Sequence, residues 1–289
     1  EVGVVTQKGL SSQAQFALEA SKVVLKEYND YFGTPYPLPK LDNIASPGRS
    51  QFFGAMENWG AIYTFEYAML LDPSISTPAD KQGVFSIAAH EIAHQWFGDL
   101  VTMRWWDDLW LNEGFASWMA ARTTEKLHPE WNTKLYAVGA RESAMNRDAV
   151  ETTHPVVQHV ETVEQASQAF DAITYSKGEA VIRMLEGYVG ADAWRDGVRR
   201  YMKAHAYGNT VSDDLWREVE AAAYLLFQDF GIASDVWSAT SLTELRRDGL
   251  AAERWNLLHP AEEPRVPYVQ ECLQGHDGCR RMPVIRGSN

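Results

Sequence analysis

The segment AAHEIAHQWFGDL, residues 88–100, places three polar side chains in a run that is otherwise mostly apolar or small. In an α-helix, residues four apart differ by about 40° in direction and about 6 Å in height, so His90 and His94 share one face. Glu91 lies about 100° round the helix from His90, within reach of a ligand held by both imidazoles. Uncompensated polar groups are costly among apolar neighbours, so a solvated helix face is the weaker interpretation. The segment predicts two metal-ligating histidines with a carboxylate beside them.

The helix that contains this segment has recognisable boundaries. Thr77 is a good N-cap, Pro78 suits the first helical position and Asp80 suits the first turn. Gly98 is expected just after the last turn. The metal-binding residues therefore belong to the C-terminal half of a helix that begins near residue 78.

A hydrolytic zinc site needs three protein ligands and one open position. Glu113 in LWLNEGFASWMAAR follows His94 with 18 residues between them, at the start of a second predicted helix. An acidic residue near a helix start is also an ordinary dipole-stabilising choice, so Glu113 alone leaves both interpretations open. With the two histidines before it, Glu113 is the expected third ligand. Small residues would let the second helix approach the first: Ala116, Ser117, Ala120 and Ala121.

HEIAH, the 18-residue spacing and Glu113 within WLNEGFA together resemble the gluzincin zinc aminopeptidases of the aminopeptidase N and puromycin-sensitive type, a family that also includes leukotriene hydrolase. The second hallmark of that family, Gly-Ala-Met-Glu-Asn, stands unaltered at residues 54–58. The resemblance implies an α+β, helix-rich fold. It would be a thermolysin-like zinc metallopeptidase catalytic domain with a small mixed sheet and a mainly α-helical lobe. It also implies one Zn²⁺ per chain, held by His90, His94 and Glu113.

The same resemblance assigns substrate binding to the pentapeptide. It implies that Gly54, Ala55, Met56, Glu57 and Asn58 line the substrate backbone, and that Glu57 binds the α-ammonium group. A fixed carboxylate makes a charge-assisted hydrogen bond that an internal peptide bond cannot replace, so such a site selects free N-termini. By pattern alone, GAMENWG would be a glycine-bounded strand end.

FDAITYSKGEAVIRML resembles the family segment with a catalytic tyrosine, which corresponds here to Tyr175. The chain has 12 tyrosines, so residue chemistry alone would not select this one, and a helix tyrosine is usually a packing residue. The implied catalytic pair is Glu91, which moves a proton from a zinc-activated water to the leaving amine, and Tyr175, which stabilises the oxyanion. In RWWDDLW (104–110) the tryptophans are assigned to packing. Asp107 and Asp108 either orient a ligand imidazole or are solvated loop acids.

Apolar spacing and breaker residues predict the other elements. Helices are expected at 11–33, 109–127, 132–146, 174–189, 192–206 and 213–228. A strand is expected at 41–45, and an edge strand with a turn within 52–67. The chain is therefore helix-rich after residue 78.

We expect two segments: a catalytic domain at 1–223 and an atypical C-terminal tail at 224–289. The tail has seven arginines and no lysine, and it contains both cysteines, Cys272 and Cys279, which could pair. One hypothesis is a fusion junction or out-of-frame translation. We do not expect the family's N-terminal β-rich domain or its C-terminal modules within these 289 residues.

The predicted function is zinc-dependent hydrolysis of the N-terminal peptide bond of peptides with a free N-terminus. One alternative is a zinc-binding but inactive peptide-binding fragment. Another is a leukotriene-hydrolase-like epoxide hydrolase, which is disfavoured because that group typically has Gly where Ala55 stands. A net charge of −13 argues against a nucleic-acid partner, and no apolar run is long enough for a membrane span. Oligomeric state and compartment are left open.

Overall fold

The computed structural model describes residues 1–218, 221 and 242–273 of the chain. The chain divides into two compact units, Glu1–Ala222 and Ala223–Asn289. Each is described by itself. In the described residues, no helix combines the length and apolar character that a membrane span requires.

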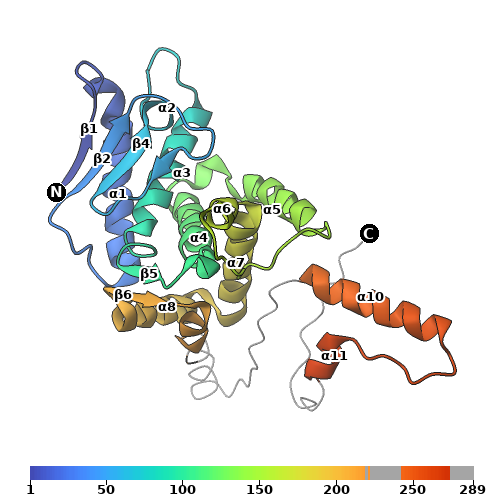
Figure 1. Ribbon diagram of the computed structural model, residues 1–289. Helices are drawn as coiled ribbons and strands as arrows, with labels where there is room; N and C mark the ends of the chain where they lie inside the picture. Colours follow the sequence, from blue (N-terminus) through green and yellow to red (C-terminus); the bar gives the residue numbers. More distant parts are fainter. Residues whose placement is uncertain (219–220, 222–241, 274–289) are drawn as a thin grey trace. The chain divides into compact units, whose positions relative to one another are not determined.

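The first unit begins with a four-stranded mixed sheet in the order β1 (Val2–Val5), β2 (Leu41–Ser46), β4 (Ala61–Phe65) and β3 (Ala55–Met56). The pairs β1–β2 and β2–β4 are parallel, whereas β3 is an edge strand antiparallel to β4. Alternate β2 residues are buried, as expected for a sheet with one face on the core. In Figure 1 this sheet lies on one side of α1 and α3, and α4, α5 and α7 lie on the other.

Helix α1 (Gln15–Phe32) follows a 3₁₀ turn, η1 (Ser11–Ala14), and ends at Gly33, whose left-handed φ of 63° closes the last turn. The Tyr28 hydroxyl of α1 donates to the Ala89 carbonyl of the zinc-motif helix at 2.8 Å. A buried apolar cluster joins the sheet to the neighbouring helices: Ala17, Ala45, Met69, Leu71 and Val84. These contacts fix the sheet against the helix that carries HEIAH.

That helix is α3 (Pro78–His94), and its start is as predicted. Thr77 accepts from the Asp80 backbone N–H while Asp80 accepts from the Thr77 backbone, which is a capping box. The C-terminal boundary was predicted too late, because α3 ends at His94 and a tight turn separates it from Gly98 (φ 137°). The next residue, Gln95, is the C-cap of α3 and keeps right-handed helical backbone angles (φ −60°, ψ −18°).

Helix α4 (Trp110–Leu127) packs along α3. A short 3₁₀ turn, η2 (Trp106–Asp108), precedes it, and β5 (Val101–Met103) pairs in parallel with β6 (Gly208–Thr210). The β5–β6 sheet was not predicted, and neither were β1 and the short helix α2 (Glu66–Met69).

The rest of the unit is helical. It comprises η3 (Pro129–Trp131), α5 (Lys134–Asp148), α6 (Val163–Gln168), the π-helical turn η4 (Ile173–Lys177), α7 (Gly178–Val189) and α8 (Ala191–His205). Residues 212–218 are helical as well, and the rest of the helix expected at 213–228 lies largely outside the described residues. The helix-rich α+β fold with a small mixed sheet is confirmed.

The second unit contains two described helices, α10 (Leu242–Leu258) and α11 (Tyr268–Leu273), in a region where no helix was predicted. Asn256 bonds the Arg265 backbone at both N–H and C=O, and the Arg265 guanidinium lies over the Trp255 ring. Cys279, the suggested partner of Cys272, lies outside the described residues.

Candidate active site

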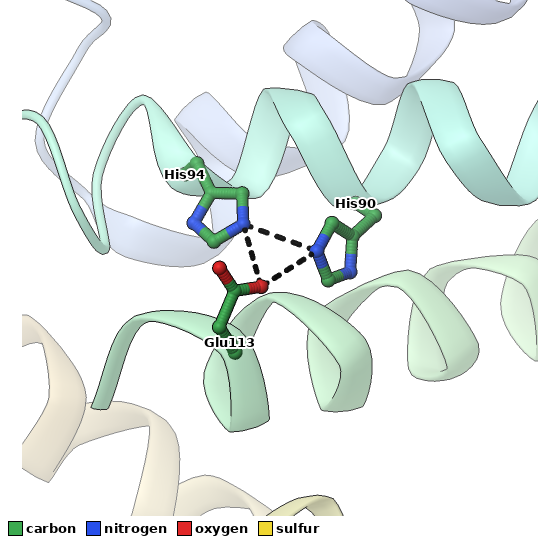
Figure 2. A group of neighbouring side chains, drawn as sticks. All are labelled: His90, His94 and Glu113. Atoms are coloured by element: carbon green, nitrogen blue, oxygen red, sulfur yellow. Dashed lines mark hydrogen bonds and ion pairs between the residues drawn. The ribbon is translucent and has the colours of Figure 1, made fainter. Parts of the chain in front are cut away.

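The three predicted metal ligands meet at one point between α3 and α4. The Nε2 atoms of His90 and His94 are 3.1 Å apart, and Glu113 Oε2 lies 3.2 Å from the first and 3.3 Å from the second. Figure 2 shows both imidazoles descending from α3 towards the carboxylate of Glu113 on α4. The geometry follows from the i, i+4 spacing on one helix and from a second helix packed against that face.

These spacings fit a zinc ion. Ligand atoms about 2.0–2.1 Å from a tetrahedral centre stand about 3.3 Å from one another, and two nitrogens with one carboxylate oxygen form a common zinc donor set. His94 Nδ1 lies 2.9 Å from the Phe97 carbonyl. Because a carbonyl only accepts, Nδ1 carries a hydrogen and Nε2 is left for the metal.

The electrostatic environment between His90, His94 and Glu113 favours a positive charge. Burial lowers the pKa of His94, but the neighbouring Glu113 carboxylate outweighs burial and raises that pKa to about 10. Burial raises the pKa of Glu113, and the two histidines then lower it far below its ordinary value. Without a metal, a proton compensates the buried carboxylate, and a metal cation would take over that role.

Glu91 is buried, with 7% of its surface exposed. Burial raises its pKa to about 7, against the lowering effect of the two histidines. Glu57, Glu91 and His94 each offer a ligand atom, and these three atoms lie within 4.8 Å of one another. Two carboxylates beyond the ligand set therefore face the same small volume.

The pentapeptide Gly54–Asn58 lies along and just beyond edge strand β3. Ala55 and Met56 pair with Thr64 and Tyr63 of β4, and the Gly54 carbonyl accepts from the Phe65 N–H. Met56 is 39% exposed, whereas Ala55 is buried. This arrangement agrees with the expected edge strand, and it brings the Glu57 carboxylate to the metal ligands.

Tyr175 reaches the site from η4. Its ring stacks on the His90 ring with centroids 6.0 Å apart and 17° between the planes. Burial together with the charge of the Glu113 carboxylate raises the pKa of its hydroxyl far above the ordinary value. The hydroxyl is therefore protonated at neutral pH and able to donate.

Two glycines explain how Tyr175 comes so close. A Cβ on Gly114 would lie 3.1 Å from the Gly178 backbone, and a Cβ on Gly178 would lie 3.3 Å from Gly114 Cα. Gly114 follows Glu113 directly, and Gly178 lies three residues after Tyr175. The backbone contact between α4 and the start of α7 therefore places Glu113 next to Tyr175.

The carboxylates of Asp107 and Asp108 accept hydrogen bonds from segments that are distant in sequence. Asp107 accepts from the Val160 backbone N–H at 2.8 Å and contacts His159. Asp108 is 6% exposed and accepts from both the hydroxyl and the backbone N–H of Ser212. The expectation of a solvated loop acid is wrong for Asp108, because its carboxylate caps the backbone at Ser212.

A family model described as the Peptidase family M1 domain matches residues 16–237. The chain belongs to peptidase family M1. The M1 family is zinc-dependent in general, and the donor set of His90, His94 and Glu113 agrees with that chemistry.

Among M1 relatives, this chain is 44% identical to Aminopeptidase M1-B of Oryza sativa subsp. japonica over 220 residues, which are 76% of this chain and 25% of the relative. It is 45% identical to Probable aminopeptidase 2 of Sulfurisphaera tokodaii over 76% of this chain and 28% of the relative. It is also 45% identical to Endoplasmic reticulum aminopeptidase 1 of Homo sapiens over 71% of this chain and 22% of the relative. The chain thus spans about a quarter of the length of these M1 relatives.

Three residues that support this site were not predicted from the sequence. Gln95 is fully buried and bonds the backbone on both sides of the Glu57 turn. Asp171 accepts from the Ile173 and Thr174 N–H groups at the start of η4, and His154 bonds the Asp171 carboxylate at 2.9 Å. A glutamine inside an apolar run was an available signal for Gln95, whereas nothing local linked His154 to Tyr175.

Proposed function

We propose that this chain contains the catalytic domain, residues 1–223, of a zinc aminopeptidase that hydrolyses the N-terminal peptide bond of peptides. The observation that supports it best is the position of Glu57. A carboxylate oxygen of Glu57 lies within 4.8 Å of a carboxylate oxygen of Glu91 and of an imidazole nitrogen of His94. A carboxylate at that distance suits the free ammonium group next to the bond being cleaved.

One zinc ion per chain would be held by His90, His94 and Glu113. When bound, it would polarise the scissile carbonyl and lower the pKa of a water molecule. Glu91 accepts the proton of that water and delivers it to the leaving amine, for which a carboxylate with a pKa near 7 is well suited.

The other residues position and stabilise the substrate. The Tyr175 hydroxyl donates to the carbonyl oxygen as negative charge develops there. The edge strand at Gly54–Asn58 offers backbone groups along which a peptide can lie, as in β-strand addition. Glu57 then anchors the α-ammonium group, so only the first residue of a peptide reaches the cleavage point.

The electrostatics agree with a cationic ligand end. Asp99 is a further, half-buried acid near this site. Burial raises its pKa to about 8 against the lowering effect of His94, with further increases from Glu57 and Glu91. A group of neighbouring acids favours a metal ion and an ammonium group, and the net charge of −13 gives no support to binding of a nucleic acid.

The test is hydrolysis of a panel of aminoacyl chromogenic amides, each beside its N-acetylated form, with and without a chelator. We expect cleavage of the free-amine substrates alone, loss of activity with chelator and recovery on adding zinc. Glu91→Gln should retain zinc and lose at least about 100-fold in kcat. Bound zinc without any cleavage would favour an inert peptide-binding fragment, and equal cleavage of blocked substrates would contradict the role of Glu57.

A further inference from the structure

Gln95 occupies an unusual position at the end of the zinc-motif helix. It directly follows the ligand His94, its side chain has no exposed surface, and it lies where α3 has just ended. A buried primary amide needs partners for its hydrogens and for its oxygen, because each unmade bond costs free energy. The hydrogen-bond partners of Gln95 therefore indicate its structural role.

Those partners are the two ends of one turn. Gln95 Nε2 donates to the Glu57 carbonyl at 2.9 Å, and the Gly60 N–H donates to Gln95 Oε1 at 3.0 Å. The Tyr36 hydroxyl makes a longer contact of 3.5 Å to the same oxygen. We call the two bonds from Gln95 to Glu57 and Gly60 the clamp. The turn between them is closed by a hydrogen bond from the Ala61 N–H to the Asn58 carbonyl.

Little else fixes Glu57. Strand β3 ends one residue earlier at Met56 and is only two residues long, and Asn58 is exposed. Gly60 has a left-handed φ of 79°, which would strain any other residue, and a Cβ there would lie 2.8 Å from Leu38 Cδ1. The clamp thus connects a tight turn directly to the residue that follows a metal ligand.

We propose that Gln95 is a positioning residue that sets the distance between the Glu57 carboxylate and the metal ligands, and so determines selectivity for a free amino terminus. This rests on the proposed function, since it assigns the amine to Glu57. Because His94 and Gln95 are consecutive, the metal and the amine anchor share one backbone reference.

The experiment compares Gln95→Met, Gln95→Glu and the wild type. Met keeps the approximate volume without either bond, whereas Glu keeps an acceptor for Gly60 and loses the donor to Glu57. Tyr36→Phe is the matched control, because it removes the hydroxyl beside the same amide and leaves both clamp bonds in place. Each variant is first checked for bound zinc and for its unfolding transition.

The main readout is binding, so it does not depend on turnover. Calorimetry compares the affinity of leucine hydroxamate with that of N-acetyl-leucine hydroxamate. Amine selectivity is measured as the dissociation constant of the acetylated ligand divided by that of the free-amine ligand. We expect the wild type and Tyr36→Phe to share one ratio. That ratio should fall about tenfold in Gln95→Met and Gln95→Glu, mainly through the free-amine ligand.

Each result decides the matter. An unchanged ratio in both Gln95 variants, or an equal weakening of both ligands, would overturn the positioning role, as would loss of zinc in both. A wild type that does not distinguish the two ligands would overturn amine recognition by Glu57 and the role of Gln95 together. A wild type that discriminates but does not cleave the amide panel would remove the proposed activity and leave the inference on Gln95 standing.

Discussion

His94 has a separate task for each of its ring nitrogens. Nδ1 contacts the Phe97 carbonyl at 2.9 Å, and Nε2 faces His90 and Glu113. The carbonyl becomes available because α3 ends at His94 and the chain turns back. The end of the helix therefore orients the His94 ring, in the way that a carbonyl often orients a metal-binding imidazole.

The hydroxyl of Tyr175 is expected to act mainly in the transition state. Tyr175→Phe should lower kcat by about 100- to 1000-fold with little change in KM or in zinc content, because the lost donor stabilises charge that exists only during reaction. Steady-state kinetics on a free aminoacyl amide would measure this. Tyr188→Phe, at an exposed position of α7, is the control and should leave kcat unchanged. Loss of zinc from the Tyr175→Phe variant would show a structural role instead.

At the scale of elements, α4 and the start of α7 approach each other closely at Gly114 and Gly178. Gly114→Ala should destabilise the protein by about 1–3 kcal/mol, since its Cβ would overpack against Gly178. It should also lower turnover, because the contact sets Tyr175 beside Glu113. Urea unfolding would give the free energy. Gly187→Ala within α7 meets no atom within 4 Å, so it should be neutral or stabilise by about 0.4–1 kcal/mol.

The pair His154–Asp171 should make the stability of η4 depend on pH. The bond to Asp171 raises the pKa of His154 against the effect of burial, and both ring nitrogens have acceptors. A raised folded pKa gives stability that is complete below the unfolded value of about 6.5 and is lost as pH rises through the folded value. Burial raises the pKa of Asp171, but the bonds from His154 and the backbone lower it, so the contribution of that carboxylate disappears below about pH 4.

His154→Gln should therefore destabilise by about 0.5–1 kcal/mol between pH 4.5 and 6, as expected for a partly screened pair, and by less above pH 8. Chemical unfolding across this range would test it. Because Arg147 also lies near Asp171 and the charge of Lys177 acts on His154, a double-mutant cycle with Asp171→Asn isolates the pair. A pH-independent difference would contradict the charged pair.

The predictable parts of the molecule are those set by local spacing. The shared face of His90 and His94 on α3 and the capping residues of that helix depend on a few consecutive residues. The chain offered no local signal for the β5–β6 pairing, or for the contact of Gly114 with Gly178, because each joins segments far apart in sequence. Tyr175 could be selected from 12 tyrosines only through family resemblance.

At the scale of the whole molecule, metal binding should support the fold. A ligand that binds only the folded state, at 100 times its dissociation constant, stabilises by about 2.7 kcal/mol. For a chain of this size that is about 5–10 °C in unfolding temperature. Calorimetry with and without chelator would measure the shift. His90→Ala should show little or none, and an unchanged wild type would argue against zinc as a structural cation.

Helix α3 and the residue after it place His90, Glu91, His94 and Gln95 within six consecutive positions. One inserted residue inside that stretch would rotate everything beyond it by about 100°. The two histidines, Glu91 and the bonds of Gln95 to the Glu57 turn would then be separated in one event. We therefore expect insertions to be tolerated only outside residues 90–95, where the spacing of this helical turn stays intact.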